Sequence, residues 1–194
     1  MTTRIDQQLA FLIEADKLKS VLRGTTLNDS SRFENSAEHS WHVILFALTM
    51  AEHANSAINI DRVIKMLLIH DLVEIDAGDV PIHSAAARDG AQQELAEQAA
   101  ATRIFSLLPQ DQGNAFRTLW DEFEAAQTPD AIFAKSIDRV QPVVSNLQSG
   151  GQSWRDYNVT REQLDTRVGQ KVKLGANAIW NRLKQQIDAW FLDN

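Results

Sequence analysis

Residues 61–78, DRVIKMLLIHDLVEIDAG, decide the fold that this sequence predicts. Apolar side chains from Val63 to Ile75 cover nearly every side of a helix drawn through this stretch. Such a helix is buried, because it has no polar face to turn toward water. Asp61 is a good N-cap residue and Gly78 a good terminator, so we expect a central, buried helix between them.

Three polar residues, His70, Asp71 and Glu74, lie within this apolar helix. Their spacing of three and four residues places them on one side of it. Burying polar groups without partners is costly, and burying charges is more so, which means that the three side chains need a common partner. A divalent cation satisfies imidazole and carboxylate together, and a site without sulfur suits Mn, Fe, Co, Ni or Zn. The alternative is a core histidine bonded to an acid.

Two further polar residues interrupt apolar stripes on other helices. His39 lies in the first turn of a helix expected over residues 35–54, and Asp138 lies in the middle of one expected over residues 128–147. Each residue alone has an ordinary structural explanation. Together with the His-Asp pair of the central helix they form a series on three helices, which predicts a shared metal site.

Helical periodicity runs through the rest of the chain. Besides the central helix, we expect helices over residues 9–22, 35–54, 87–107, 109–126, 128–147 and 160–192. No segment alternates with period two, and the polar residues 24–36 predict a loop. The expected fold class is all-α, with about six or seven helices. We expect residues 1–194 to form one domain, in which a core of about 23–147 holds the metal site and the helix at 160–192 packs on that core or on a dimer partner.

The composition limits the possible functions. The chain has 19 Lys and Arg residues against 26 Asp and Glu, a net charge of −7, which disfavours nucleic acid as the main partner because phosphate backbones need clustered cations. A small phosphorylated substrate is compatible with this charge if a metal supplies positive charge. The absence of cysteine excludes disulfides, thiolate metal sites and cysteine nucleophiles. No apolar run reaches the ~18 residues of a membrane span, and Asp6 comes too early for a signal peptide, so we expect a cytoplasmic protein without a membrane partner.

The series Glu38-His39, His70-Asp71 and Asp138 resembles the HD-domain metal-dependent phosphohydrolases, and most closely the 5′-deoxynucleotidases, which are nucleoside 5′-monophosphatases. The matching stretches are 32–39 (RFENSAEH), 70–74 (HDLVE), 78–81 (GDVP) and 135–138 (KSID). The resemblance extends over residues 23–147. It implies a helical HD domain that acts on a small phosphorylated nucleoside.

The resemblance also implies roles for individual residues. One divalent metal ion (Co, Mn, Fe, Ni, Zn or Mg) is expected to bind His39, His70, Asp71 and Asp138. Glu74 is expected to be the catalytic general acid/base. The nucleoside is expected to lie against Asp79, Val80, Pro81 and Ile82. HD proteins with two metals place two further histidines between the His-Asp pair and the last Asp, whereas here only His83 lies there, so one metal is the better interpretation.

Arg23 and Lys135 are the expected phosphate contacts. The nucleotidases of this family carry an arginine followed by an aromatic residue before the first ligand histidine, but here Gly24 follows Arg23. The preference for base and sugar therefore stays open. Lys135 lies three residues before Asp138, and it faces either the same cavity or the protein surface.

The leading hypothesis is a metal-dependent enzyme that releases phosphate from nucleoside (deoxy)5′-monophosphates. Two alternatives stay open: the same chemistry on a nucleoside triphosphate or another small phosphoester, and a metal- or nucleotide-binding regulatory protein with little turnover. We also expect a homodimer, because the family resemblance adds to an apolar stripe on the last helix, formed by Trp180, Leu183, Ile187, Trp190 and Phe191. The alternative is that this stripe covers the protein's own core.

Overall fold

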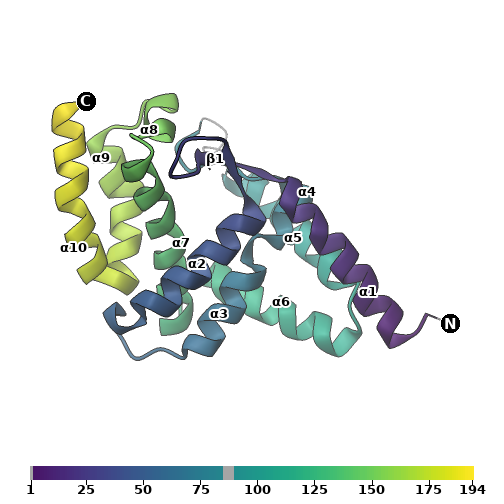
Figure 1. Ribbon diagram of the computed structural model, residues 1–194. Helices are drawn as coiled ribbons and strands as arrows, with labels where there is room; N and C mark the ends of the chain where they lie inside the picture. The colour runs from purple at the N-terminus through teal and green to yellow at the C-terminus, as the bar shows by residue number, and fades with distance from the viewer. Residues whose placement is uncertain (1, 85–89) are drawn as a thin grey trace.

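The computed structural model describes residues 2–84 and 90–194, and helices make up most of it (Figure 1). The α-helices are α1 (Arg4–Ala15), α2 (Ser36–Met50), α3 (Ile60–Ile69), α4 (Glu74–Ala77), α5 (Gly90–Phe105), α6 (Gln110–Ala125), α7 (Pro129–Gln148), α8 (Gln152–Asp156), α9 (Arg161–Leu164) and α10 (Gln170–Asp193). The all-α prediction is confirmed. The expected start of the helix at residues 87–107 lies outside the described residues. None of the described helices has both the length and the apolar character needed to cross a membrane.

The predicted central helix is divided into three parts. α3 ends at Ile69, residues His70–Val73 wind as a 3₁₀ turn, and α4 follows from Glu74. The prediction of one continuous helix was therefore wrong, because the backbone tightens at the His-Asp pair. The prediction of burial is right for Val63 and Leu67, which are fully buried, but it was wrong for Leu68, which is 57% exposed, so one side of α3 faces solvent. A 3₁₀ stretch within a longer helical run often marks a functional site.

The predicted loop at residues 24–36 contains a small two-stranded sheet. β1 (Leu22–Thr26) pairs antiparallel with β2 (Phe33–Asn35). The strands have no apolar alternation because their buried side chains are polar, Thr25, Thr26 and Glu34. The first strand carries Arg23, and the second leads directly into α2.

The helices α2 and α7 begin where the sequence predicts. The Asn35 side chain accepts a hydrogen bond from the Glu38 amide at 2.9 Å, and the Glu38 side chain accepts one from the Asn35 amide, which completes the capping box. Thr128 caps α7 by accepting from the amide of Ala131. These caps set the start of the helix that carries His39 and of the helix that carries the last predicted ligand.

The larger hydrophobic core joins α7 to α10, α2 and α3. Trp180, Leu183 and Ile187 of α10 are buried in it. Trp190 and Phe191 are partly buried and pack against the same core. The apolar stripe of the last helix therefore covers the protein's own core, which is the second of the two interpretations, and it does not provide a dimer surface. A second, smaller core lies between the 3₁₀ turn and helices α1, α5 and α6.

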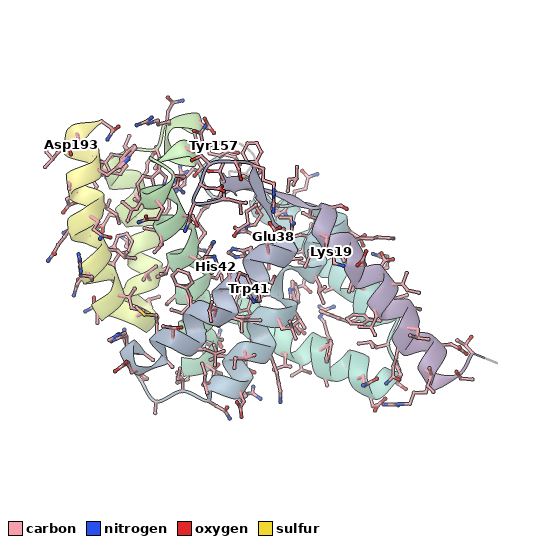
Figure 2. All side chains as sticks on the ribbon, viewed as in Figure 1. Lys19, Glu38, Trp41, His42, Tyr157 and Asp193 are labelled. Carbon is pink, nitrogen blue, oxygen red and sulfur yellow. The ribbon has the colours of Figure 1, made fainter. Side chains whose placement is uncertain are left out.

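Large apolar side chains are exposed instead on α1 and α2. We call these two groups the α1 stripe (Ile5, Leu9, Leu12 and Ile13) and the α2 stripe (Trp41, Leu45 and Leu48). The members follow one another at mostly three- and four-residue spacing, so each group lies along one side of its helix. Trp41 is 65% exposed and lies on α2 in the view of Figure 2. Apolar area of this kind on a protein surface is typical of an interaction site.

Candidate metal centre and active-site cavity

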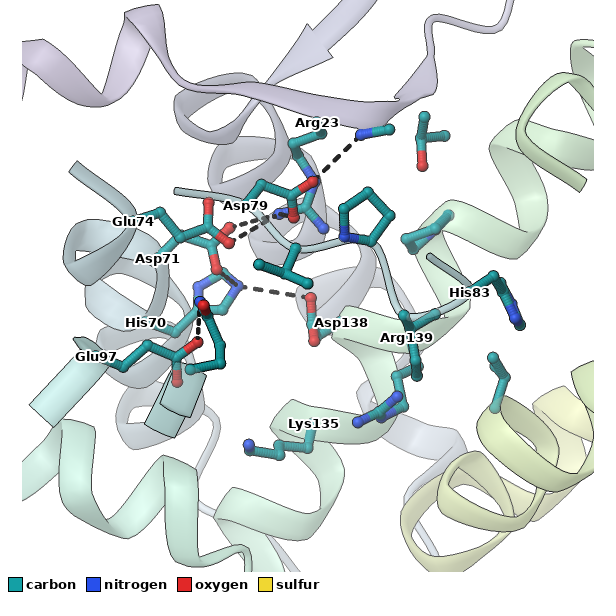
Figure 3. Close-up of a pocket in the computed structure, with 18 of the residues that line it drawn as sticks. Arg23, His70, Asp71, Glu74, Asp79, His83, Glu97, Lys135, Asp138 and Arg139 are labelled. Carbon is teal, nitrogen blue, oxygen red and sulfur yellow. Dashed lines mark hydrogen bonds and ion pairs between the residues drawn. The ribbon is translucent and has the colours of Figure 1, made fainter. Parts of the chain in front are cut away.

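A cavity of about 770 Å³ opens beside the predicted metal site (Figure 3). Its wall is built from β1, the 3₁₀ turn, the loop after α4, and parts of α5, α6 and α7. Ten of the eleven predicted site residues line it, namely Arg23, His70, Asp71, Glu74, Asp79, Val80, Pro81, Ile82, Lys135 and Asp138. The eleventh, His39, is fully buried behind this wall and contacts Asp138. The tertiary fold thus brings the whole predicted set to one place.

The predicted metal ligands converge from three separate elements. The ligand atoms of His39, His70 and Asp138 all lie within 4.8 Å of one another. Asp138 Oδ1 lies 2.8 Å from His39 Nε2 and 3.5 Å from His70 Nε2. Asp71 adjoins this group, because its Oδ1 lies 3.0 Å from His70 Nε2 and its Oδ2 lies 3.9 Å from His39 Nε2.

His70 presents an unused nitrogen to this group. Its Nδ1 lies 2.8 Å from the carbonyl oxygen of Leu67, which can only accept, so Nδ1 carries the proton. Nε2 therefore carries a lone pair, and it is buried without a hydrogen-bond partner among the described residues. Leaving a buried acceptor unpaired costs free energy. A histidine with one ring nitrogen bonded to a backbone carbonyl and the other free is arranged as a metal ligand.

His39 is oriented by Gln141 in a similar way. Its Nδ1 lies 2.9 Å from Gln141 Oε1, and Gln141 Nε2 donates to Glu34 Oε1 at 2.9 Å. Burial and the charge of Arg23 lower the pKa of His39, but hydrogen bonds to Asp138 and Glu34 outweigh them and raise it to about 9. The acidic surroundings of His39 therefore stabilise a positive charge at its Nε2 atom. A divalent cation can supply this charge as well as a proton can, so these residues fit a metal.

Gln141 was not among the site residues predicted from the sequence. Its side chain is almost fully buried and also lies 3.2 Å from His42 Nδ1. The sequence feature that could have identified Gln141 is its position three residues after Asp138, because this spacing places a second polar group on the same side of α7. Its partner Glu34 was hidden in the segment expected to be a loop.

Arg23 is engaged with acidic residues of the site. Its Nη1 lies 3.0 Å from Asp71 Oδ2, 3.6 Å from Glu74 Oε1 and 3.7 Å from Asp79 Oδ1. Burial disfavours the charged guanidinium, but these three carboxylates, led by Asp71, outweigh it and raise the pKa of Arg23 above its usual value. A buried cation therefore stands next to the predicted ligand and the predicted acid/base.

Glu74 is held by Ser36, whose Oγ donates to Glu74 Oε2 at 2.5 Å. Burial raises the pKa of Glu74, and the charges of Asp71 and Asp79 raise it further, to about 9, against the opposing charge of Arg23. A carboxyl group with such a pKa holds a proton at neutral pH. That property suits a group that exchanges protons during catalysis.

Lys135 lines the cavity, as one of the two interpretations predicted. Its Nζ lies 2.7 Å from Glu124 Oε2 and 4.8 Å from the centre of the Phe123 ring. The lysine therefore faces the cavity with its charge already paired to an acid of α6.

Gly24 allows β1 to approach the loop after α4. A Cβ atom at this position would lie 2.7 Å from Pro81 Cγ and 3.0 Å from the hydroxyl of Tyr157. The Gly24 amide also donates to Asp79 Oδ2 at 3.2 Å. The glycine after Arg23 is thus a packing requirement, and the space beside it is filled by Pro81 and Tyr157.

A family profile described as HD domain matches residues 15–180. The chain therefore belongs to the HD-domain family, and the resemblance stated from the sequence is confirmed. This family assignment agrees with the His and Asp series that the fold brings together.

Individual solved structures and relatives indicate which HD-domain proteins are similar to this chain. The crystal structure of a predicted metal-dependent phosphohydrolase from Magnetospirillum magnetotacticum MS-1 is similar, with a TM-score of 0.91 and 43% identity over 98% of this chain and 96% of that one. A 5′-deoxynucleotidase from Bos taurus is 28% identical over 70% of this chain. One from Erwinia tasmaniensis is 24% identical over 83% of each chain. The match spans only 64% of the bovine relative's length.

Proposed function

We propose that this protein is a divalent-metal-dependent phosphohydrolase that releases phosphate from nucleoside (deoxy)5′-monophosphates. The observation that carries the proposal is the unpaired Nε2 of His70, which faces Asp71 and Asp138 at the wall of a nucleotide-sized cavity. The names of the relatives, 5′-deoxynucleotidases and a phosphohydrolase, support the choice of reaction.

In this proposal the metal, when bound by His39, His70, Asp71 and Asp138, supplies charge neutralisation for the phosphoryl group. Glu74 exchanges the proton: it takes one from the attacking water or gives one to the leaving 5′-oxygen. The water oxygen forms a new bond to phosphorus, the bond from phosphorus to the 5′-oxygen breaks, and the products are a nucleoside and inorganic phosphate. Arg23 donates to a phosphoryl oxygen, which holds the group for in-line attack.

The substrate is small in this proposal. Val80, Pro81 and Ile82 provide an apolar wall for the nucleoside, and Asp79 lies beside them near Arg23. The cavity volume suits one nucleotide. A net charge of −7 repels a polyanion such as DNA or RNA, whereas one metal ion can still hold one phosphate.

The two alternatives make different demands on the site. A nucleoside triphosphate or another small phosphoester would use the same residues with a different occupant of the cavity. A regulatory protein with little turnover would not need Glu74, whose pKa of about 9 and hydrogen bond from Ser36 suit proton exchange. We therefore favour the enzyme.

A phosphate-release screen tests the proposal. The purified protein is treated with a chelator, and Mn²⁺ or Co²⁺ is added with nucleoside monophosphates, nucleoside triphosphates or DNA at matched phosphate concentration. We expect activity to be lost with the metal and restored with it, and to be highest on a monophosphate. Full activity after verified metal removal would contradict the metal requirement, and faster hydrolysis of DNA would contradict the substrate.

We also propose a homodimer in the cytoplasm, with residues 1–194 as one domain. The exposed α1 and α2 stripes, rather than α10, are the surface that would join the two copies. Apolar side chains such as Trp41 are costly to leave in water and are typical of the centre of subunit interfaces.

A further inference from the structure

Among the residues that the structure describes, one cation of the cavity wall has no acidic partner. Arg23 is paired with Asp71, and Lys135 with Glu124. Arg139, which follows Asp138 on α7, also lines the cavity, but its only side-chain hydrogen bond in the described part of the chain is a donation to the Arg167 carbonyl oxygen at 3.4 Å. No carboxylate of residues 2–84 and 90–194 forms an ion pair with it within 4.0 Å.

Arg167 and His83 interact with Arg139, and neither of them is an acid. Arg167, from the π-helical turn Asp165–Gly169, donates to the Ile82 carbonyl oxygen at 3.2 Å and likewise has no acidic partner in the described chain. His83 lines the same part of the cavity, and its Nδ1 is buried without a hydrogen-bond partner among the described residues. Burial and then the charges of Arg167 and Arg139 lower the pKa of His83 to about 4. We call these three residues the Arg139 cluster. Its two arginines form no ion pair with a carboxylate in the described part of the chain, and His83 is neutral at pH 7.

Acidic and basic side chains therefore lie on different sides of the cavity. Glu94 and Glu97 of α5 line the cavity, as does Glu124 of α6, whose charge is paired with Lys135. In the view of Figure 3, Glu97 lies at the left of the cavity and His83 at the right, with Arg139 and Asp138 between them. A ligand whose 5′-phosphate lies at Arg23 and the metal ligands would be repelled by the acidic wall if it carried a second anionic group. The same group would be attracted to the Arg139 cluster.

We propose that the Arg139 cluster is a second anion site, which binds a second phosphate group on the side of the sugar away from the 5′-phosphate. This inference rests on the proposed function, since it assumes that a 5′-phosphate lies at the metal site. Its ligand class is a nucleotide with two separated phosphates, such as a nucleoside 3′,5′-bisphosphate. Arg139 supplies the planar pair of donors that suits a phosphate, and His83 lines the same cavity with its Nδ1 unpartnered among the described residues.

Calorimetric binding measures this second contact without turnover. The Glu74→Gln protein with Mn²⁺ is titrated with a deoxynucleoside 5′-monophosphate, with the corresponding 3′,5′-bisphosphate and with the 5′-diphosphate. We expect the 3′,5′-bisphosphate to bind about tenfold more tightly than the monophosphate, and we expect Arg139→Gln to abolish that gain while leaving monophosphate binding unchanged. Arg182→Gln, an equal charge change on the exposed face of α10, is the matched control and should keep the gain.

Three results would overturn the inference. The bisphosphate could bind no more tightly than the monophosphate. Arg139→Gln could weaken both ligands equally, which would place this arginine on the 5′-phosphate. The 5′-diphosphate could show the larger gain that depends on Arg139, which would place the second anion next to the first. Phosphate release from the monophosphate by the wild-type protein is measured in parallel, so that a failure of the proposed reaction is seen separately from a failure of the second site.

Discussion

Arg23 Nη1 lies 3.0 Å from Asp71 Oδ2, so a largely buried residue of β1 and a predicted metal ligand form an ion pair in the cavity wall. The pair matters because Asp71, Glu74 and Asp79 all depend on the same guanidinium. Their mutual repulsion is lowered by one cation from β1 and, in the proposed function, by the metal. The small sheet thus has a direct role in holding the acidic site together.

Replacing Arg23 tests this role. We expect Arg23→Met to lower the free energy of unfolding of the metal-free protein by about 3–5 kcal/mol, because it leaves buried carboxylates without their cation. Added Mn²⁺ should recover part of the loss by supplying positive charge to the same group. Urea unfolding with and without Mn²⁺ measures both effects. Arg182→Met is the control, and a loss below about 1 kcal/mol in Arg23→Met would show that the carboxylates do not depend on this residue.

Variants of Asp71 and Glu74 should lose activity for different reasons. Asp71→Ala removes a proposed ligand, so bound metal and activity should be lost together. Glu74→Gln keeps the size of the side chain but cannot exchange a proton, so the protein should keep its metal while kcat falls by about 10²–10⁴. Metal analysis and steady-state kinetics on both variants separate the two roles.

Two outcomes would reassign Glu74. Loss of metal from Glu74→Gln would make it a ligand. A lower melting temperature with kcat within a few fold of wild type would leave it only a structural partner of Ser36 and Arg23.

Gln141 should control metal affinity through His39. Gln141→Leu removes the acceptor that fixes Nδ1 of His39, so the imidazole can rotate or change its protonated nitrogen. We expect metal affinity to fall by about 10–100-fold, as is usual when the partner of a ligand histidine is removed. Competition with a metal indicator measures the affinity. Gln152→Leu, at an exposed position of α8, is the control, and an unchanged affinity in Gln141→Leu would mean that Glu34 alone orients the ring.

The α2 stripe should hold the homodimer together. Light scattering of the wild type at micromolar concentration is expected to give twice the 21.8 kDa mass of one chain. Introducing a charge with Leu45→Glu should give the single-chain mass with the helical circular dichroism unchanged, because charges are excluded from the centre of such interfaces. Leu192→Glu, at an 85% exposed position near the end of α10, should leave the dimer intact. A wild-type mass of one chain would refute the dimer, and an intact Leu45→Glu dimer would move the interface off α2.

Much of the site could be predicted from the chain alone, because its polar residues interrupt apolar helices. His39, His70 and Asp71 are buried and Asp138 is half-buried, and a polar group in such a position without an ordinary partner is visible in the sequence. The capping signals at Asn35 and Thr128 are equally local, because a cap bonds to amides within its own first turn. These features depend on neighbours within four residues, which the sequence specifies directly.

The tertiary structure decided what those residues face. Helical periodicity gives the direction of a side chain around its own axis, but it does not say which other helix lies there. It therefore could not reveal that Gln141 orients His39, that the Nη1 atom of Arg23 pairs with three carboxylates, or that Arg139 pairs with no carboxylate of residues 2–84 and 90–194. Periodicity also could not show what covers α10. The same apolar stripe would be present in the sequence whether the helix packed on a second copy of the chain or on its own core. The sequence by itself determined which side chains are buried polar groups, and only the packing of α2, α7 and the β1 strand determined how their charges are balanced.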